Sequence, residues 1–195
     1  MRKPAKLLLI TIFLFIPNCF SSAISAESHK QNKELAQRSE ELRKERELEY
    51  RTSVEKRMFD SLISKPSVKW LLTGFLEDQI TYESTGDQNA VSPKGALGIA
   101  QFLPTTWEWM IDTHLIPAWF DIYNSRHQSI AQLIYMDHLY QLWKGHINDR
   151  KALTVASYDA GAGTVYDIVK QYGDNWKDYL PNETKNYLDY FKIYV

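Results

Sequence analysis

The sequence is poor in cysteine, in zinc-binding motifs and in excess charge of either sign. Cys19 is its single cysteine, so no disulfide can form within the chain, and neither a CxxC pair nor an HExxH motif occurs. The 23 Lys and Arg nearly balance the 24 Asp and Glu, which argues against a nucleic-acid-binding protein with a basic surface. Hydrophobic residues, in contrast, make up 44% of the 195 residues and aromatic residues 13%, enough for the core of one domain.

An apolar run long enough to cross a membrane is also missing. The run at residues 7–16 is too short to span ~30 Å of hydrocarbon as a helix. Three basic residues precede it, and small residues follow it up to Ala26. This pattern predicts a secretory signal peptide over residues 1–26, cleaved after Ala26 or Ala23. Two alternatives are a lipid anchor on Cys19 and an uncleaved membrane anchor.

Residues 27–57 are dominated by charge, with 8 Glu and 9 Lys or Arg. Glu34, Glu40 and Glu47 each stand four residues before a Lys or Arg, the favourable order on a helix. Apolar residues are sparse and form no sustained heptad. We interpret the segment as a charged helical tether, with a helix that docks a partner as the alternative.

Residues 58–195 hold all six tryptophans and repeat their apolar residues with helical spacing. The pattern predicts a mainly α domain, single and compact, with at most a small β-hairpin near residues 87–97. Helices are expected at Trp70 to Tyr82, after a Thr105–Glu108 capping box, at Ser129–Lys144, Ala152–Tyr158, Val165–Tyr172 and Pro181–Tyr194. The four histidines of this part are expected to be helix or surface residues and not metal ligands.

Glu83 is the first candidate for chemistry. It ends an apolar helical stretch and meets a loop rich in Gly and Ser, a position that can half-bury a carboxyl group. No Lys or Arg lies between Lys69 and Lys94, so no nearby cation in the sequence opposes the rise in pKa that burial causes. A general acid that works near neutral pH needs such a pKa. The alternative is a solvated glutamate at a helix end.

Three blocks of sequence resemble the soluble lytic transglycosylases, a family related to goose-type lysozyme. The first block, Glu83–Gln101, follows the family pattern E-S-x-aromatic-x-x-x-A-x-S-x-x-G-A-x-G-hydrophobic-x-Q without a gap. Ala156–Val165 resembles A-A-Y-N-A-G-x-G-x-V, and Leu180–Tyr187 resembles P-x-E-T-x-x-Y. The blocks stand in the family's order between about residues 68 and 190, which makes the joint match far more specific than any one of them.

The resemblance implies a lysozyme-like fold with a deep glycan cleft and a catalytic domain over residues 58–195. It assigns Glu83 as the catalytic acid and base. The residues expected to bind or support the substrate are Ser84, Gln101, Leu103, Tyr158, Asp159, Glu183 and Tyr187. Ser84 is expected to support Glu83 itself, Leu103 can equally be a core residue, and Glu183 can serve only its own helix N-terminus.

Three positions depart from the family pattern. Gly86 stands where the family has an aromatic residue, and Ala100 replaces a common Met. Asp159 replaces Asn, which exchanges an amide that donates and accepts for a carboxylate that only accepts. The departure at Asp159 leaves the expected fold unchanged but alters the expected sugar contacts.

One motif carboxylate implies a reaction that differs from that of ordinary glycosidases, which use two. Glu83 would cleave the β-1,4 bond between N-acetylmuramic acid and N-acetylglucosamine, and the sugar's own C6 hydroxyl would close a 1,6-anhydro ring. No cofactor or metal is implied. The partners implied are peptidoglycan strands in the periplasm or outside the cell, and the conjugation or secretion machines that small members of the family often serve.

Two other functions remain open at the level of sequence. An inactive peptidoglycan-binding module could use the charged helix as an adaptor. A hydrolytic goose-type lysozyme would need a second acid to activate water, for which Asp87 and Asp112 are the candidates.

Overall fold

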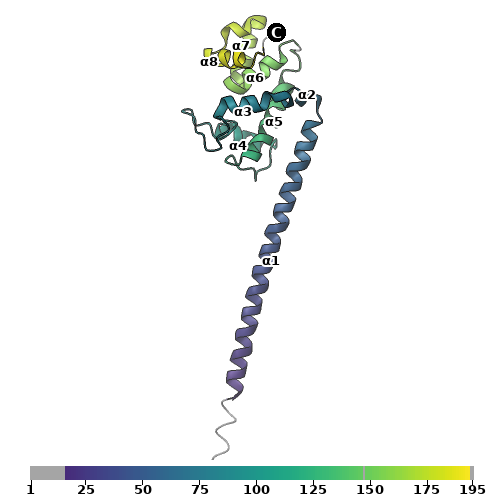
Figure 1. Ribbon diagram of the computed structural model, residues 1–195, viewed down its shortest axis with the longest axis vertical. Coiled ribbons are helices and arrows are strands. Elements are labelled where there is room, and N and C mark those ends of the chain that lie inside the picture. Colours follow the sequence, from purple (N-terminus) through teal and green to yellow (C-terminus); the bar gives the residue numbers. More distant parts are fainter. Residues whose placement is uncertain (1–15, 147, 194–195) are drawn as a thin grey trace, which may run out of the picture. The chain divides into compact units, whose positions relative to one another are not determined.

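The computed structural model describes residues 16–146 and 148–193, with side chains from residue 26 onward (Figure 1). The chain divides into two units, with the boundary between Val54 and Glu55. The predicted signal peptide falls largely on residues 1–15, which lie outside the described residues, and it therefore stays a prediction. The backbone of residues 16–26 is helical.

The unit up to Val54 consists of most of α1, which runs over Ile16–Ile63. Its charged residues pair along one turn, as in Glu47–Arg51 at 2.7 Å and Glu40–Lys44 at 4.0 Å. Exposed pairs of this kind contribute only about 0.3–0.5 kcal/mol each. Its leucines are 46–67% exposed, so local interactions and not a core hold this part of the helix. None of the described helices is long and apolar enough to cross a membrane.

The unit from Glu55 onward is mainly α, as the sequence predicts. After the last turns of α1 its elements are α2 (Pro66–Lys69), a π-helical turn η1 (Leu71–Phe75), α3 (Leu76–Ser84), α4 (Pro104–Asp112), α5 (Ser125–Leu142), α6 (Arg150–Ala160), α7 (Ala162–Tyr172), a 3₁₀ segment η2 (Gly173–Tyr179) and α8 (Asn182–Tyr190). The described residues contain no β-strand. Two isolated antiparallel bridges, Val91 to Leu97 and Leu97 to Phe102, stand where the small hairpin was expected.

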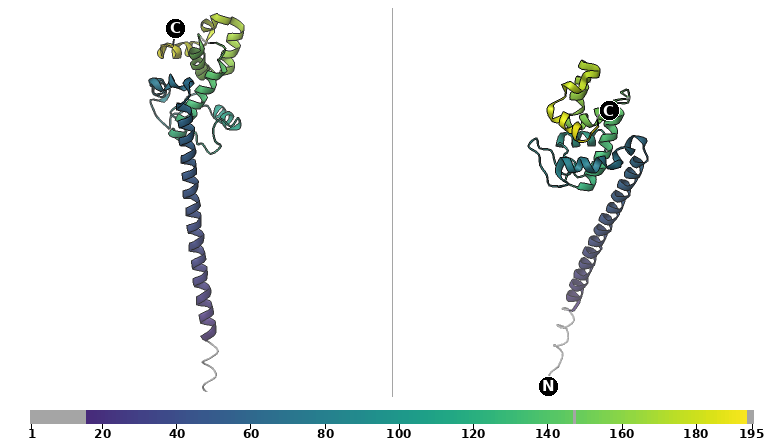
Figure 2. Two further views of the ribbon diagram at one scale, coloured as in Figure 1. Left: turned by 90° about the vertical axis from the view of Figure 1, so that its right-hand side faces the viewer. Right: turned by 45° about the horizontal axis from the view of Figure 1, so that its top comes forward.

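Helix α5 is the centre of the domain core. It buries nine residues along its length and packs against α2 and α6, while α6 in turn packs against α7 and α8. In Figure 1 helices α3, α4 and α5 lie together below the green-to-yellow helices α6 to α8, and the same two groups can be followed by colour in Figure 2. Trp107 and Trp143 are 5% and 2% exposed and belong to this core, whereas Trp109 is 39% exposed.

Some predicted helix boundaries were wrong for local reasons. The predicted capping box fails because α4 begins two residues earlier than that box implies, at Pro104, with Leu103 in the N-cap position and no side-chain cap. Proline suits the first helical position because the missing N–H needs no partner there. Thr105 therefore lies inside the first turn. The predicted helix from Trp70 to Tyr82 is interrupted at Gly74, whose φ of +100° breaks the helical backbone.

Helix α5 starts four residues before its predicted start at Ser129. Its N-cap is Asn124, whose side-chain oxygen accepts hydrogen bonds from the backbone N–H groups of Arg126 and His127 at 3.0 and 3.1 Å. At the other end of the domain, α8 stops at Tyr190 and not at Tyr194.

The last turns of α1 belong to the second unit through Glu55 and Leu62. Leu62 is 5% exposed within the core. Glu55 is 8% exposed, and its carboxylate contacts Arg126 Nε at 2.5 Å and His127 Nε2 at 3.3 Å. His127 Nδ1 accepts a hydrogen bond from the Asp121 backbone, so Nε2 carries the hydrogen and donates it to Glu55. The predicted boundary at residue 57 therefore lies three residues past the boundary of the unit.

We expect the domain to tolerate removal of residues 1–53 but not of residues 1–57. The longer truncation deletes Glu55 and leaves His127 without its acceptor, which should lower the free energy of unfolding by about 1–3 kcal/mol. Urea denaturation of the two truncated proteins measures the difference. Glu55→Gln in the full chain should reproduce part of the loss, and equal stability of the two truncations would contradict this role of Glu55.

Candidate functional site

The candidate site is a cleft of about 390 Å³ that Glu83 lines from the end of α3. Helix α3 ends at Ser84, the residue after Glu83, because Thr85 adopts a left-handed backbone with φ of 55°. The other walls come from the loop before α4, from α4 and α5, and from the ends of α6 and α8. The lining residues are Glu83, Ser92, Pro93, Lys94, Ala96, Gln101, Phe102, Leu103, Thr106, Tyr135, Tyr158, Asp159, Ala160, Gly161 and Glu183.

Ser84 ties the end of α3 to the loop that forms the next wall. Its hydroxyl donates to the Ile99 carbonyl at 2.9 Å and accepts from the Gly86 N–H at 3.1 Å. Ser84 does not line the cleft, so its contacts support the backbone beside Glu83 and do not reach the carboxyl group.

Gln128 of α5 holds the same loop by hydrogen bonds to its backbone. Its amide oxygen accepts from the Ala100 N–H at 2.8 Å, and its amide nitrogen donates to the carbonyls of Leu97 and Ile122. Gly98 lies directly over this amide with φ of +71°. Gln101, also left-handed at φ of 50°, folds its side chain back to donate to the Gly98 carbonyl at 2.8 Å. The loop is thus fixed by side chains that the motif alone does not connect.

The Glu83 carboxyl group has a pKa close to neutral pH. Its pKa is raised from the ordinary 4.5 to about 7, chiefly by burial and further by the negative charges of Asp159 and Glu183. A hydrogen bond that the Tyr187 hydroxyl donates to Glu83 Oε1 at 2.5 Å acts in the opposite direction. A carboxyl group with this pKa can both give and take a proton near neutral pH.

Asp159 and Glu183 face the cleft in different environments. Burial raises the pKa of Asp159, against the hydrogen bond from Thr184, which favours its charged form. Glu183 pairs with Lys94 at 2.7 Å, but both side chains are about two-thirds exposed. Since exposed pairs contribute little, this one can open when a ligand enters.

Two apolar or aromatic residues complete the predicted set. Tyr158 lines the cleft, and its hydroxyl donates to the Ala100 carbonyl at 2.7 Å. Burial raises the pKa of this phenol well above its ordinary value, so it stays neutral. Leu103 is 39% exposed and lines the cleft, which favours the cleft role over the core role.

The structure brings together Glu83 and five of the seven predicted supporting residues on the cleft wall. The other two, Ser84 and Tyr187, lie behind it, where Tyr187 is 1% exposed and contacts Glu83 instead of the cleft. Sequence reasoning missed Lys94 and Tyr135 as lining residues. It also missed Gln79, which donates to the Tyr187 hydroxyl at 2.9 Å. A signal for Gln79 was present, since it stands one helical turn before Glu83.

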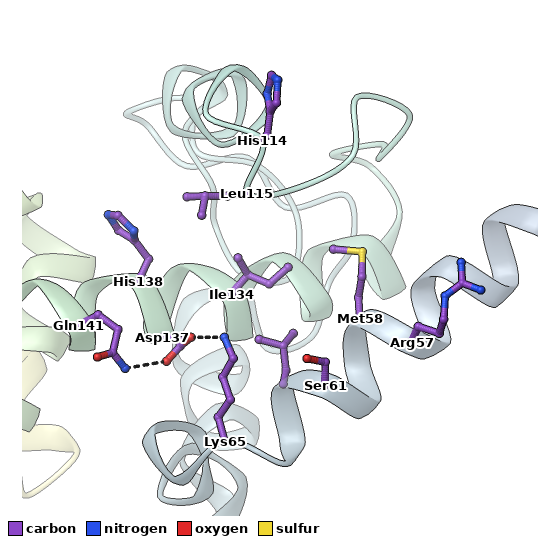
Figure 3. A pocket seen from close by; sticks show the side chains of 11 residues that line it. Arg57, Met58, Ser61, Lys65, His114, Leu115, Ile134, Asp137, His138 and Gln141 are labelled. Atoms are coloured by element: carbon purple, nitrogen blue, oxygen red, sulfur yellow. Dashed lines mark hydrogen bonds and ion pairs between the residues drawn. The ribbon is translucent and has the colours of Figure 1, made fainter.

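A second pocket of about 530 Å³ lies away from Glu83, between the end of α1, α5 and the loop after α4 (Figure 3). Asp137 is its carboxylate, and Lys65 and Gln141 bind it, as the dashed lines in Figure 3 show. With its charge neutralised at 2.7 Å by Lys65, this carboxylate is not a candidate for acid–base chemistry. Across the described residues no group of three or more His, Cys, Asp or Glu could hold a metal ion.

Comparison with known proteins gives one match. Residues 76–180, more than half of the chain, match the family described as Transglycosylase SLT domain. The matched range begins with α3 and ends just before α8, so it includes Glu83, the loop and Asp159. No curated protein and no solved structure matches the chain.

We expect Gly98→Ala to destabilise the domain by about 2–4 kcal/mol. The alanine would be forced into a left-handed backbone conformation, and its Cβ atom would overpack the loop. A Cβ atom there would lie 1.9 Å from the Gln128 amide nitrogen. Thermal melts measure the loss. Gly95→Ala is the matched control, since Gly95 also has a left-handed backbone with φ of +80° and its Cβ would meet nothing within 4 Å. Equal melting temperatures for the two variants would contradict the close approach at Gly98.

Glu83→Gln should stabilise the domain in a pH-dependent way. Because the folded pKa of about 7 lies above the ordinary 4.5, burial opposes folding only once Glu83 ionises. The gain from the amide should be absent at pH 4, grow between pH 4.5 and 7, and level off above, reaching at most about 3 kcal/mol. Urea denaturation at several pH values measures it. The exposed Glu108→Gln is the control, and a gain for Glu83→Gln that is equal at every pH would contradict the raised pKa.

Proposed function

Because the chain belongs to the transglycosylase SLT family, we propose that it is a peptidoglycan lytic transglycosylase. Its reaction is cleavage of the β-1,4 bond between N-acetylmuramic acid and N-acetylglucosamine, with formation of 1,6-anhydro-N-acetylmuramic ends. The observation that carries the proposal is the single half-buried Glu83, with a pKa of about 7, on the wall of a cleft.

Glu83 acts first as an acid and then as a base. Its carboxyl proton passes to the glycosidic oxygen, the bond from that oxygen to C1 breaks, and the N-acetylglucosamine part leaves as an alcohol. The C6 hydroxyl oxygen of the muramic sugar then bonds to C1 and gives its proton to the Glu83 carboxylate. The enzyme returns to its starting state, and the intramolecular attack needs no held water. A pKa near 7 suits both transfers.

The other cleft residues bind the glycan in this proposal. Gln101, Leu103 and Tyr158 form the wall beside the acid, and Asp159 and Glu183 are acceptors for sugar hydroxyl and amide N–H groups. The exposed Lys94–Glu183 pair opens on binding at little free-energy cost.

Hydrolysis is a second candidate, and Asp159 is the observation that favours it. The two acids first considered for this role, Asp87 and Asp112, do not line the cleft, and Asp87 accepts the Asn89 N–H of its own loop at 2.8 Å. Asp159 does line the cleft and could activate a water molecule as a base. We retain the transglycosylase because the SLT family, to which the chain belongs, has Asn at this position in its sequence pattern, so the reaction of the family does not depend on a carboxylate there.

Export and partners belong to the same proposal. Residues 1–26 act as a signal peptide that delivers the enzyme to the periplasm or the outside, where a conjugation or secretion machine uses the gap it makes in the wall. N-terminal sequencing of the exported protein tests the cleavage site, and a mature chain that retains Met1 would contradict it.

Digestion of purified sacculi followed by mass spectrometry of the muropeptides tests the reaction. We expect anhydro-muramic ends, one water lighter than hydrolytic ends. Glu83→Gln should reduce the rate by at least ~10²–10⁴-fold, since both proton transfers use this group. Reducing muramic ends would favour hydrolysis, and binding without any cleavage by the wild type would favour a binding module.

Asp159→Asn separates the two reactions. A transglycosylase that uses Glu83 alone should keep most of its rate and all of its anhydro products, because the amide still binds sugar groups. A hydrolase with Asp159 as base should lose its rate as severely as Glu83→Gln.

A further inference from the structure

A buried line of hydrogen bonds leads from the core to the catalytic acid. Gln132 Nε2 of α5 donates to Gln79 Oε1 of α3 at 2.9 Å, and Gln79 Nε2 donates to the Tyr187 hydroxyl at 2.9 Å. Tyr187 then donates to Glu83 Oε1 at 2.5 Å. The two glutamines are 0% exposed and Tyr187 is 1% exposed, so the line is closed to water from Gln132 to the phenol.

The chemistry of the groups fixes the direction of this line. An ionised Glu83 can only accept, so the single hydroxyl hydrogen of Tyr187 must point at it. The Tyr187 oxygen then needs a donor, which orients the Gln79 amide nitrogen toward it. The Gln79 oxygen faces the other way and needs a donor in turn, which Gln132 supplies.

A role in packing alone explains this arrangement poorly. Buried amides are costly unless every polar atom is bonded, and the Gln132 oxygen has no partner among the described residues. An apolar pair of similar size at positions 79 and 132 would avoid that penalty. What the amides provide is an oriented phenol.

We propose that Gln79 and Gln132 are positioning residues for the acid: they lock the Tyr187 hydroxyl so that it occupies Glu83 Oε1 and leaves the acidic proton on Oε2. The inference rests on the proposed function of Glu83. No other described residue hydrogen-bonds Oε2, and Glu83 lines the cleft, so Oε2 is the oxygen available to the glycosidic bond.

The line also affects the strength of the acid. The Tyr187 hydrogen bond favours the carboxylate and lowers the pKa of Glu83 against the effect of burial. The other groups that act on Glu83 are the charges of Asp159 on α6 and Glu183 on α8. Variants at positions 79 and 132 leave both charges in place, so a shift in the pH profile reports on the line itself.

The test compares Gln79→Met, Gln79→Glu and Gln132→Met in the full chain. Initial rates on purified glycan strands between pH 5 and 9 give kcat, KM and the pH above which activity falls. Thr154→Val is the control, because it removes a hydrogen bond from a residue that is 0% exposed in α6 and outside the line.

We expect Gln79→Met to lower kcat by about 10-fold with little change in KM, less than the ~10²–10⁴-fold of Glu83→Gln. Its alkaline limb should move to higher pH, because a loosened Tyr187 favours the carboxylate less. Gln132→Met should shift the limb in the same direction by less. Gln79→Glu should recover rate over Gln79→Met at acid pH, where a protonated carboxyl can donate to Tyr187 in place of the amide.

Two results would overturn the inference. One is a rate loss in Gln79→Met that only follows the folded fraction, with the wild-type pH profile, as expected for Thr154→Val. The other is the absence of rescue by Gln79→Glu at acid pH when that protein is folded. If Gln79→Met does not fold, Gln132→Met takes its place in the test. A shift of its alkaline limb to higher pH would support the inference, and a wild-type pH profile would overturn it. Failure of the proposed function is distinct, since Glu83→Gln would then keep its activity.

Discussion

The hydrogen bond from Tyr187 of α8 to Glu83 of α3 joins two residues that lie 104 positions apart in the chain. It places a neutral phenol against a carboxyl group that burial alone would make a weak acid. Burial raises the pKa, the phenol opposes the rise, and the result of about 7 suits the acid and base role that we propose for Glu83. The chemistry at the end of α3 therefore depends on α8 being packed in its place, as the 1% exposure of Tyr187 indicates.

The rest of the cleft divides into a rigid part and an adjustable part. Beside the acid, Ser84 and Gln128 fix the loop at residues 97–100 through its backbone groups, so the wall next to the reacting bond has little freedom. Lys94 and Glu183, in contrast, form a solvent-exposed ion pair, which contributes little free energy and holds the two side chains only weakly. In the proposed reaction the rigid part would lie beside the proton transfer, and the adjustable part would lie where a glycan strand enters the cleft.

The sequence alone was sufficient for the mainly α class, which follows from helical spacing. Its resemblance to a family also named Glu83 and five other residues that line the cleft, although these come from segments far apart in the chain. The sequence was not sufficient for the position of Tyr187 behind Glu83, for Gln79 or for Glu55. Each of these depends on a contact between segments at least 70 residues apart, which no local pattern encodes. Gln79 stood out as a polar residue in an apolar stretch, but the sequence of α3 does not indicate that its partner is Tyr187.

Gly98 and Gln128 form a steric pair, with consequences for how this domain can diverge. A side chain at position 98 would meet the Gln128 amide, which holds the loop through two hydrogen bonds, to Leu97 and Ala100. Position 98 carries a second constraint, because its φ of +71° is a backbone conformation that L side chains rarely adopt. A shorter side chain at position 128 would lose the hydrogen bonds to Leu97 and Ala100. Glycine at position 98 is therefore constrained both by backbone conformation and by space, and a change at position 128 would remove only one of the two constraints.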